Sequence, residues 1–281
     1  MRLRKALGSF RRRFFRLSLR SFLLLTTAVA VLLGYHTSHV RHQRHIVQQI
    51  RSQGGFVAYE LDKGPMHCAR FARSLLSESL FDSLMSATLW NTDLEDHFHS
   101  VVAVDFSRQE VPVEMLAWIS ELPRIRKLSL FKTGISDEHV ECFLRMPQLE
   151  VLFLNRNRIT DKGLASLSQL PKLRRLQVGY QRDVAPITDK GVAQLAALKM
   201  LESLDISESQ VTGTGFAAFP CENKLEYLNI QYTPFRDAEL LRLADFSSLR
   251  TLATADAELS DAAKIEFQKR APQCRVVPRV R

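Results

Sequence analysis

Four histidines occur at every third position early in the chain, a spacing that could place metal ligands on one side of a helix. They are His36, His39, His42 and His45. Two histidines one helical turn apart can hold a zinc ion, but steps of three residues drift around a 3.6-residue helix, so four cannot converge on one ion. No Cys, Asp or Glu lies within the stretch to complete a site. The stretch therefore reads as a solvated polar helix, with metal or pH sensing as the alternative.

A second group of titratable side chains could support acid–base chemistry. It comprises Asp93, Glu95, Asp96, His97 and His99. The group lacks a recognisable catalytic or metal-binding spacing such as H-E-x-x-H, so it is interpreted as a solvated loop.

The cysteines do not suggest a metal site. They are Cys68, Cys142, Cys221 and Cys274, and none forms a C-x-x-C pair. An oxidising compartment would permit one disulfide, but the sequence does not choose among the pairings. The chain also lacks a phosphate-binding glycine loop and a G-x-S-x-G elbow. We therefore predict a protein that is not an enzyme, with no catalytic residue, no cofactor and no metal.

The elements that position any binding residues are set by a motif that returns every 24 residues. Segments of the form L-x-x-L-x-[LVI] are spaced by 24, 24, 28, 24 and 24 residues, and they begin at Ile125, Leu149, Leu173, Leu201, Leu225 and Leu249. Val101 begins an earlier copy in the same frame, and Cys274 to Val277 would form a terminal strand. Self-similarity at this period predicts a solenoid of repeated strand–helix units.

Each unit is predicted to begin with a strand and to end with a helix. In the copy from Leu149, three leucines point inward, and the alternate side chains point onto the open face of the sheet. A short polar residue then occupies a turn, and a Ser-Asp or Thr-Asp pair such as Thr160-Asp161 starts the helix as its N-cap. The unit from Leu201 lacks this pair, so its helix is expected to be short or irregular.

These units resemble the leucine-rich repeat family, in the ribonuclease-inhibitor and F-box-associated style that carries I-T-D-x-G-L, as at Ile159 to Leu164. The resemblance implies an α/β right-handed solenoid of about six to seven units, with a parallel concave sheet and convex helices. The layout is also similar to bacterial membrane-tethered leucine-rich repeat proteins, which implies a tethered interaction module behind one N-terminal transmembrane helix.

Charge separates the N-terminal segment from the repeats. The formal charge is +9, but residues 1–59 hold 11 Lys or Arg and no acid, since the first acidic residue is Glu60. The remainder has 28 basic and 30 acidic residues, a balance of −2. A nearly neutral repeat region argues against a nucleic-acid groove, so no nucleic-acid partner is predicted.

An uncharged run from Ser21 to Tyr35 follows eight basic residues. As a helix it would extend roughly 22 Å, which snorkelling arginines and neighbouring leucines could lengthen to a span. We predict a single-pass anchor with a cytoplasmic N-terminus and the repeat domain on the outer side. The alternatives are a cleaved signal peptide and an organelle transit peptide.

The predicted organisation has five parts. They are a basic tail at 1–20, the transmembrane anchor at 21–36, a juxtamembrane helix at 37–55 ended by Gly54-Gly55, an N-terminal cap region at 56–100, and the leucine-rich repeat domain at 101–281.

Side chains on the concave face are the predicted binding site, because solenoids commonly bind partners there and aromatic and Arg residues are enriched at binding hot spots. The predicted residues are Lys127, Phe131, Val151, Phe153, Arg175, Gln177, Tyr180, Tyr227, Asn229 and Tyr232, with Arg182 and Asp183 in the inserted rim loop. The predicted function is protein binding by a membrane-tethered module. A self-associating envelope protein and a soluble adaptor released by N-terminal cleavage are the alternatives.

Overall fold

The computed structural model describes residues 19–61, 99–180 and 186–277. The chain divides into two compact units, and we describe each by itself. The first contains Met1–His45 and Gly64–His97, and the second contains Ile46–Lys63 and Phe98–Arg281.

The described part of the first unit is helical. The helix α2 covers Leu19–Ser52, so the predicted anchor and most of the predicted juxtamembrane segment form one continuous helix whose last residues belong to the second unit. The helix ends at Ser52. Gly54 follows with a φ of +78°, a conformation that glycine adopts without steric cost and that prevents the helix from continuing. No helix among the described residues has the length and apolarity needed to cross a membrane.

The histidine spacing does not build a metal site in the described region. His39, His42 and His45 are exposed on α2. Nowhere in residues 19–61, 99–180 and 186–277 do three His, Cys, Asp or Glu side chains gather as a metal site would require. Of the predicted acid–histidine cluster only His99, the first residue of β2, lies inside the described residues.

The second unit is built on a sheet whose nine described strands follow one another in chain order. The first two strands pair antiparallel and every later neighbour pairs in parallel. The strands are β1 (Phe56–Leu61), β2 (His99–Asp105), β3 (Lys127–Ser129), β4 (Val151–Phe153), β5 (Arg175–Gln177), β6 (Ser203–Asp205), β7 (Tyr227–Asn229), β8 (Thr251–Ala253) and β9 (Arg275–Val277). This alternation of strand and helix on a parallel sheet confirms the predicted solenoid.

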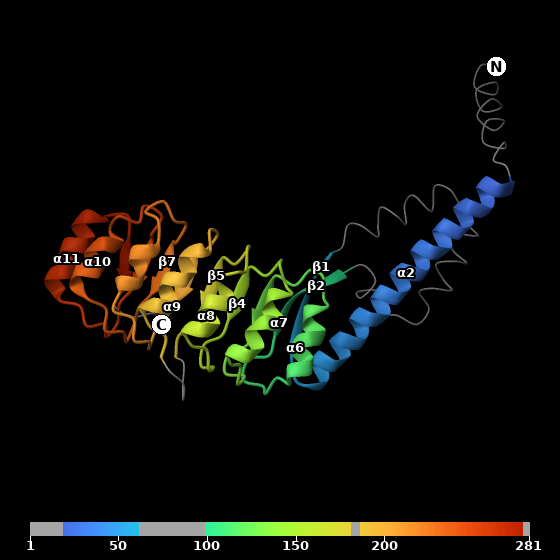
Figure 1. Ribbon diagram of the computed structural model, residues 1–281, viewed down its shortest axis with the longest axis horizontal. Coiled ribbons are helices and arrows are strands. Elements are labelled where there is room, and N and C mark those ends of the chain that lie inside the picture. The colour runs from blue at the N-terminus through green and yellow to red at the C-terminus, as the bar shows by residue number, and fades with distance from the viewer. Residues whose placement is uncertain (1–18, 62–98, 181–185, 278–281) are drawn as a thin grey trace, which may run out of the picture. The chain divides into compact units, whose positions relative to one another are not determined.

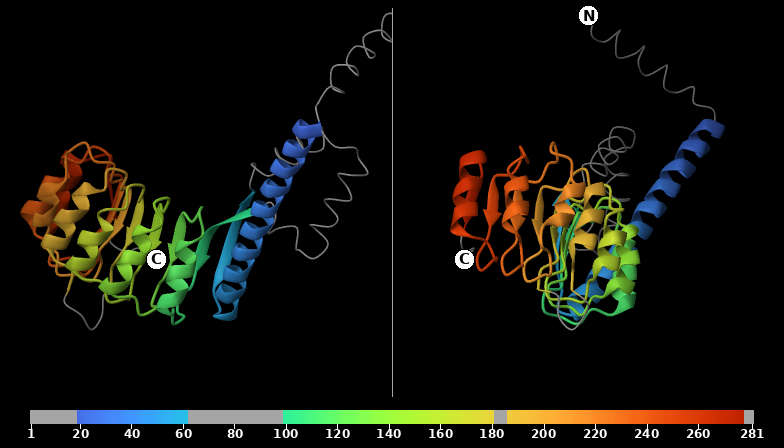
Figure 2. Two further views of the ribbon diagram at one scale, coloured as in Figure 1. Left: turned by 45° about the vertical axis from the view of Figure 1, so that its right-hand side comes forward. Right: turned by 60° about the vertical axis from the view of Figure 1, so that its left-hand side comes forward.

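Helices cover one face of this sheet. Figure 1 shows α6 to α11 in a row on one side of the strands, and Figure 2 shows the same layer from two further directions. Their bounds are α6 (Val113–Ser120), η1 (Asp137–His139), α7 (Val140–Leu144), α8 (Asp161–Leu167), α9 (Asp189–Gln194), η2 (Leu195–Ala197), η3 (Thr214–Ala218), α10 (Asp237–Leu243) and α11 (Asp261–Arg270). The 3-10 turn η3 stands where the sequence predicts a short or irregular helix.

The strands align in the register that the 24-residue period predicts. Lys127 pairs with Val151, and Val151 pairs with Arg175. Between strands and helices runs one continuous apolar core of the repeated leucines, of which Leu128, Leu152 and Leu176 are fully buried. Each unit thus buries its apolar side only against its neighbours, as expected of a solenoid.

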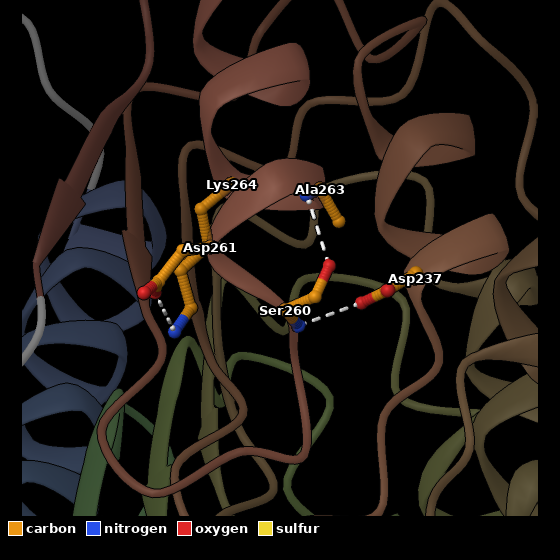
Figure 3. Close-up of polar contacts among 5 residues, drawn as sticks. All are labelled: Asp237, Ser260, Asp261, Ala263 and Lys264. Carbon is orange, nitrogen blue, oxygen red and sulfur yellow. Dashed lines mark hydrogen bonds and ion pairs between the residues drawn. The ribbon is translucent and has the colours of Figure 1, made fainter.

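Aspartates at the helix starts link neighbouring repeats. The carboxylate of Asp161 accepts hydrogen bonds from the backbone N–H (2.8 Å) and hydroxyl (2.6 Å) of Thr188, one repeat later. Asp137 binds Thr160 in the same way. Figure 3 shows the last such pair, in which the Ser260 N–H donates to Asp237 (2.9 Å) while the Ser260 hydroxyl accepts from the Ala263 N–H (3.1 Å). The predicted N-cap pair therefore also joins one repeat to the next.

The hydrogen bonds that the Asp189 carboxylate accepts from the next repeat predict that the stability of the fold depends on pH. Burial alone would raise the pKa of Asp189, but hydrogen bonds, the first of them from the Gly215 N–H, outweigh burial and lower it below the ordinary carboxyl value. Folding therefore favours the ionised form, and its stabilisation is present above roughly pH 4 and is lost as the pH falls through the folded-state pKa. We expect Asp189→Asn to cost about 1 to 2 kcal/mol of unfolding free energy at pH 7 and less at pH 3.

Urea unfolding of both proteins at pH 7, 5 and 3 measures this difference. Asp245→Asn serves as a control, because Asp245 is exposed. A cost for Asp189→Asn that stays constant across the pH range would contradict the prediction.

Candidate functional site

The open face of the sheet, which lies opposite the helices, carries the alternate side chains of the strands. One row across it consists of Lys127, Val151, Arg175, Ser203, Tyr227 and Thr251. Lys127 and Arg175 are exposed, and Val151 and Tyr227 are half-buried. This row corresponds to the predicted concave face.

Two and four residues further along the strands, several polar side chains are buried. The Asn155 amide donates to Asp205 (3.3 Å), and Asp205 also accepts from the Ser207 hydroxyl (2.6 Å). Gly179 lies against this pair, since a Cβ on it would come within 2.4 Å of the Ser207 hydroxyl oxygen. These buried side chains hold the strand ends together and are not available to a partner, whereas Phe153 remains partly accessible.

Cations stack on aromatic rings at the beginning of the open face. The Arg156 guanidinium lies 5.7 Å from the centre of the Phe131 ring and 5.1 Å from that of Tyr180. Arg108 lies 5.9 Å from the same Phe131 ring, and the Lys127 ammonium lies 5.5 Å from the ring of Phe153. Such contacts are worth about 0.5 to 1 kcal/mol at exposed sites, and they hold both groups in defined positions.

The third residue after each strand from β2 to β8 has a left-handed backbone. The seven described non-glycine residues with positive φ, between 49° and 67°, are Arg108, Lys132, Arg156, Tyr180, Glu208, Tyr232 and Asp256, which we call the rim row. In the first six of them the N–H donates to a carbonyl of the next repeat, as when the Arg156 N–H donates to the Gly179 carbonyl (3.1 Å). These six residues of the rim row therefore join neighbouring repeats while their side chains lie beside the open face.

Two tyrosines of the site keep their phenol protons. Burial raises the pKa of Tyr227, and the Asp205 carboxylate raises it further. Burial and the Glu208 carboxylate raise the pKa of Tyr180 against the opposing charge of Arg156. Both phenols are therefore neutral hydrogen-bond donors at physiological pH.

Comparison with known proteins also identifies repeats in the part of the chain that forms this surface. Residues 123–181 match the family model of the leucine-rich repeat. The chain therefore contains leucine-rich repeats. The matched segment contains Phe131, Phe153, Arg156 and Tyr180 of the open face and rim row. No curated protein sequence matches the chain.

Several solved structures are similar to this chain. An internalin from Listeria monocytogenes shares 16% identity over 68% of this chain and 53% of that chain, with a TM-score of 0.48. An internalin C2 from the same organism shares 26% identity over 59% of this chain and 74% of that chain, with a TM-score of 0.39. A Leptospira interrogans leucine-rich repeat protein shares 15% identity over 60% of this chain, at a TM-score of 0.42. The chain spans about half the length of the first and third, 53% and 51%.

The structure brings most of the predicted site residues to one surface of the second unit. Lys127, Phe131, Val151, Phe153, Arg175, Gln177, Tyr180 and Tyr227 are at least partly accessible on the open face or rim, and Tyr232 is 43% exposed. Asn229 is buried, and its side chain accepts from the Gln231 N–H (3.1 Å), so it acts within the fold. Arg182 and Asp183 lie outside the described residues.

The sequence-based site omits five of the seven rim-row residues. It includes Tyr180 and Tyr232, and the missing cations are Arg108, Lys132 and Arg156. A signal for them was present, because they recur at 24-residue spacing together with Tyr180 and each directly precedes the turn position of its unit. Their stacking on the aromatic rings required coordinates.

The described cysteines are free thiols that differ in solvent exposure. Cys221 is exposed, Cys142 is half-buried and Cys274 is buried, while Cys68 lies outside the described residues. Burial raises the pKa of Cys274 to about 11, against the smaller opposing effect of Arg250. Since the thiolate is the reactive form, Cys274 is expected to be inert in the folded protein.

We expect a thiol reagent at pH 8 to modify Cys221 within minutes and Cys274 only after unfolding. Peptide mass spectrometry of protein quenched at increasing times, with and without urea, measures the two rates. Equal rates at the two positions without urea would contradict the prediction.

Proposed function

We propose that the repeat domain is a non-enzymatic module that holds a protein partner on its open face. The leucine-rich repeat fold supports a protein-interaction role in general, because stacked repeats present one extended continuous surface. The observation that carries the proposal for this face is the stacking of Arg108, Arg156 and Lys127 on Phe131 and Phe153. Aromatic and Arg side chains that are already fixed lose little entropy when a partner binds.

Affinity capture with the full chain tests this proposal. We expect Phe131→Glu/Phe153→Glu/Tyr227→Glu to lose a protein that the unmodified chain retains from native membranes and extracts. The matched control is Ala165→Glu/Gln194→Glu/Ala262→Glu, which adds the same three charges at exposed positions on the helices. Circular dichroism checks that both variants remain folded.

The outcomes separate the open face from other surfaces. A protein kept by the control and lost by the open-face variant supports the proposal. Equal retention by all three proteins would show that the partner binds elsewhere. Capture of only a second copy of this chain would indicate self-association in place of a distinct partner.

We also propose that the N-terminal segment tethers the module to a membrane, with the N-terminus in the cytoplasm and the repeats outside. The support comes from the sequence, in which eight cations precede an uncharged run from Ser21 to Tyr35. We expect the chain to stay with membranes after alkaline carbonate extraction and Leu24→Arg/Val29→Arg to be released. Recovery of the unmodified chain in the soluble fraction would refute the tether.

A further inference from the structure

The charges of the open face and rim row are divided between its two halves. The half from β2 to β5 carries five cations, Arg108, Lys127, Lys132, Arg156 and Arg175, against the single carboxylate of Asp105. The half from β6 to β9 carries the carboxylates of Asp205, Glu208 and Asp256 against the single cation Arg275.

The five cations have no carboxylate partner within the described parts of the chain. Other described arginines are paired, for example Arg174 with Glu202 and Arg270 with Glu266. The five open-face cations form no ion pair with any residue of 19–61, 99–180 and 186–277. Neighbouring strands lie about 4.8 Å apart, so these like charges repel one another. An incoming anion would relieve that repulsion.

The aromatic contacts leave the guanidinium groups able to bind such an anion. The guanidinium carbons of Arg108 and Arg156 lie 5.9 Å and 5.7 Å from the centre of the Phe131 ring, a contact that holds each cation without using it in an ion pair. Each guanidinium can therefore donate paired hydrogen bonds to a carboxylate.

The backbone adds a second argument that these side chains have a role. Arg108, Lys132 and Arg156 have φ values of 67°, 55° and 60°. Left-handed backbone costs roughly 1 to 2 kcal/mol for a residue with a Cβ, and glycine is the residue that avoids this cost. Three consecutive repeats use long cationic side chains at this position, where glycine would fit the backbone better.

Building on the proposed protein-binding role, we infer that the partner segment is charge-divided, with acidic residues over β2 to β5 and uncharged or basic residues over β6 to β9. The rim row from Arg108 to Asp256 crosses six strand spacings, about 29 Å, which an extended segment of about nine residues would cover. A nucleic acid fits less well, because its uniform phosphate charge would meet the exposed carboxylates of Glu208 and Asp256.

Two fluorescent peptides of identical composition test the charge division against the full chain. One has four glutamates, a Ser-Gly-Ser-Gly spacer and four lysines, and the other alternates glutamate and lysine around the same spacer. We expect the block peptide to bind at least tenfold more tightly by fluorescence anisotropy, and to weaken as salt is added. Equal affinities would overturn the inference.

Two protein variants with the same change in net charge locate the contact. Arg108→Glu/Lys132→Glu/Arg156→Glu is expected to weaken block-peptide binding at least tenfold. Lys162→Glu/Lys190→Glu/Lys199→Glu, at exposed positions away from the open face, is expected to leave it within twofold. Equal losses in both variants would show that only overall charge matters. A twelve-base single-stranded DNA provides the alternative ligand. If it binds more tightly than the block peptide and this binding is lost in the rim variant, the rim row would be assigned to nucleic acid instead.

The inference and the proposed function fail in distinguishable ways. If open-face glutamates abolish capture of a protein but the block peptide shows no preference, the charge-divided partner is wrong and the protein-binding face stands. If no protein depends on the open face and the block peptide is not preferred, both are wrong.

Discussion

Replacing Asn157 with alanine is expected to lower the free energy of unfolding by about 3 kcal/mol. Asn157 is 1% exposed, and its side-chain amide forms hydrogen bonds both within its own repeat and with the preceding repeat. Its oxygen accepts from the N–H groups of Thr133 (3.0 Å) and Ile135 (3.1 Å). Its nitrogen donates to the carbonyls of Leu130 (2.6 Å) and Leu154 (2.9 Å). Alanine would remove the acceptor of the buried Thr133 and Ile135 N–H groups, and leaving buried donors unpaired is the costly outcome.

The equivalent position of another repeat supplies the control. Ser209 is also buried, but its hydroxyl oxygen has no hydrogen-bond partner among the described residues. Ser209→Ala is therefore expected to change the unfolding free energy by less than about 0.5 kcal/mol, or to stabilise slightly. Urea unfolding followed by circular dichroism measures both variants. Similar costs at the two positions would mean that burial, and not the hydrogen-bond network, sets the effect of Asn157.

The second large effect is expected from Gly215→Ala, at about 2 to 3 kcal/mol. A Cβ at Gly215 would lie 2.4 Å from the backbone carbonyl oxygen of Asp189 in the preceding repeat. Backbone cannot move aside as a flexible side chain can, so the repeats would have to separate locally. That movement would also disturb the Gly215 N–H bond to the Asp189 carboxylate (2.9 Å).

Gly134→Ala separates crowding from backbone strain. Gly134 has a φ of +79° and nothing within 4 Å of the position of a Cβ, so alanine there meets strain without a clash. We expect about 1 kcal/mol for this control. A cost for Gly215→Ala no larger than that of Gly134→Ala would refute the close contact between the repeats.

These two predictions concern residues whose roles the sequence shows only in part. The sequence places Asn157 at a turn and Gly215 in the first helical turn, both from the 24-residue frame. It does not show that Asn157 serves the preceding repeat as well as its own, or that Gly215 touches Asp189. Contacts between repeats join residues about 24 positions apart, and a local pattern cannot describe their distances.

The sequence by itself determined the repeat period, the parallel register and the apolar core, because a strand–helix unit that cannot bury its apolar side alone must stack on its neighbours. It also indicated which strand residues, such as Lys127 and Phe153, reach the open face, because strand side chains alternate.

Only the tertiary structure decided which polar residues bind one another and which remain available. It buried Asn229 and Asp205, which alternation alone would present to a partner, because Asp205 bonds across repeats to Asn155 and Asn229 bonds to the Gln231 N–H of its own repeat. It also placed Arg156 between Phe131 and Tyr180. The physical reason is that these interactions depend on side-chain directions across neighbouring strands, which the left-handed backbone of the rim row sets.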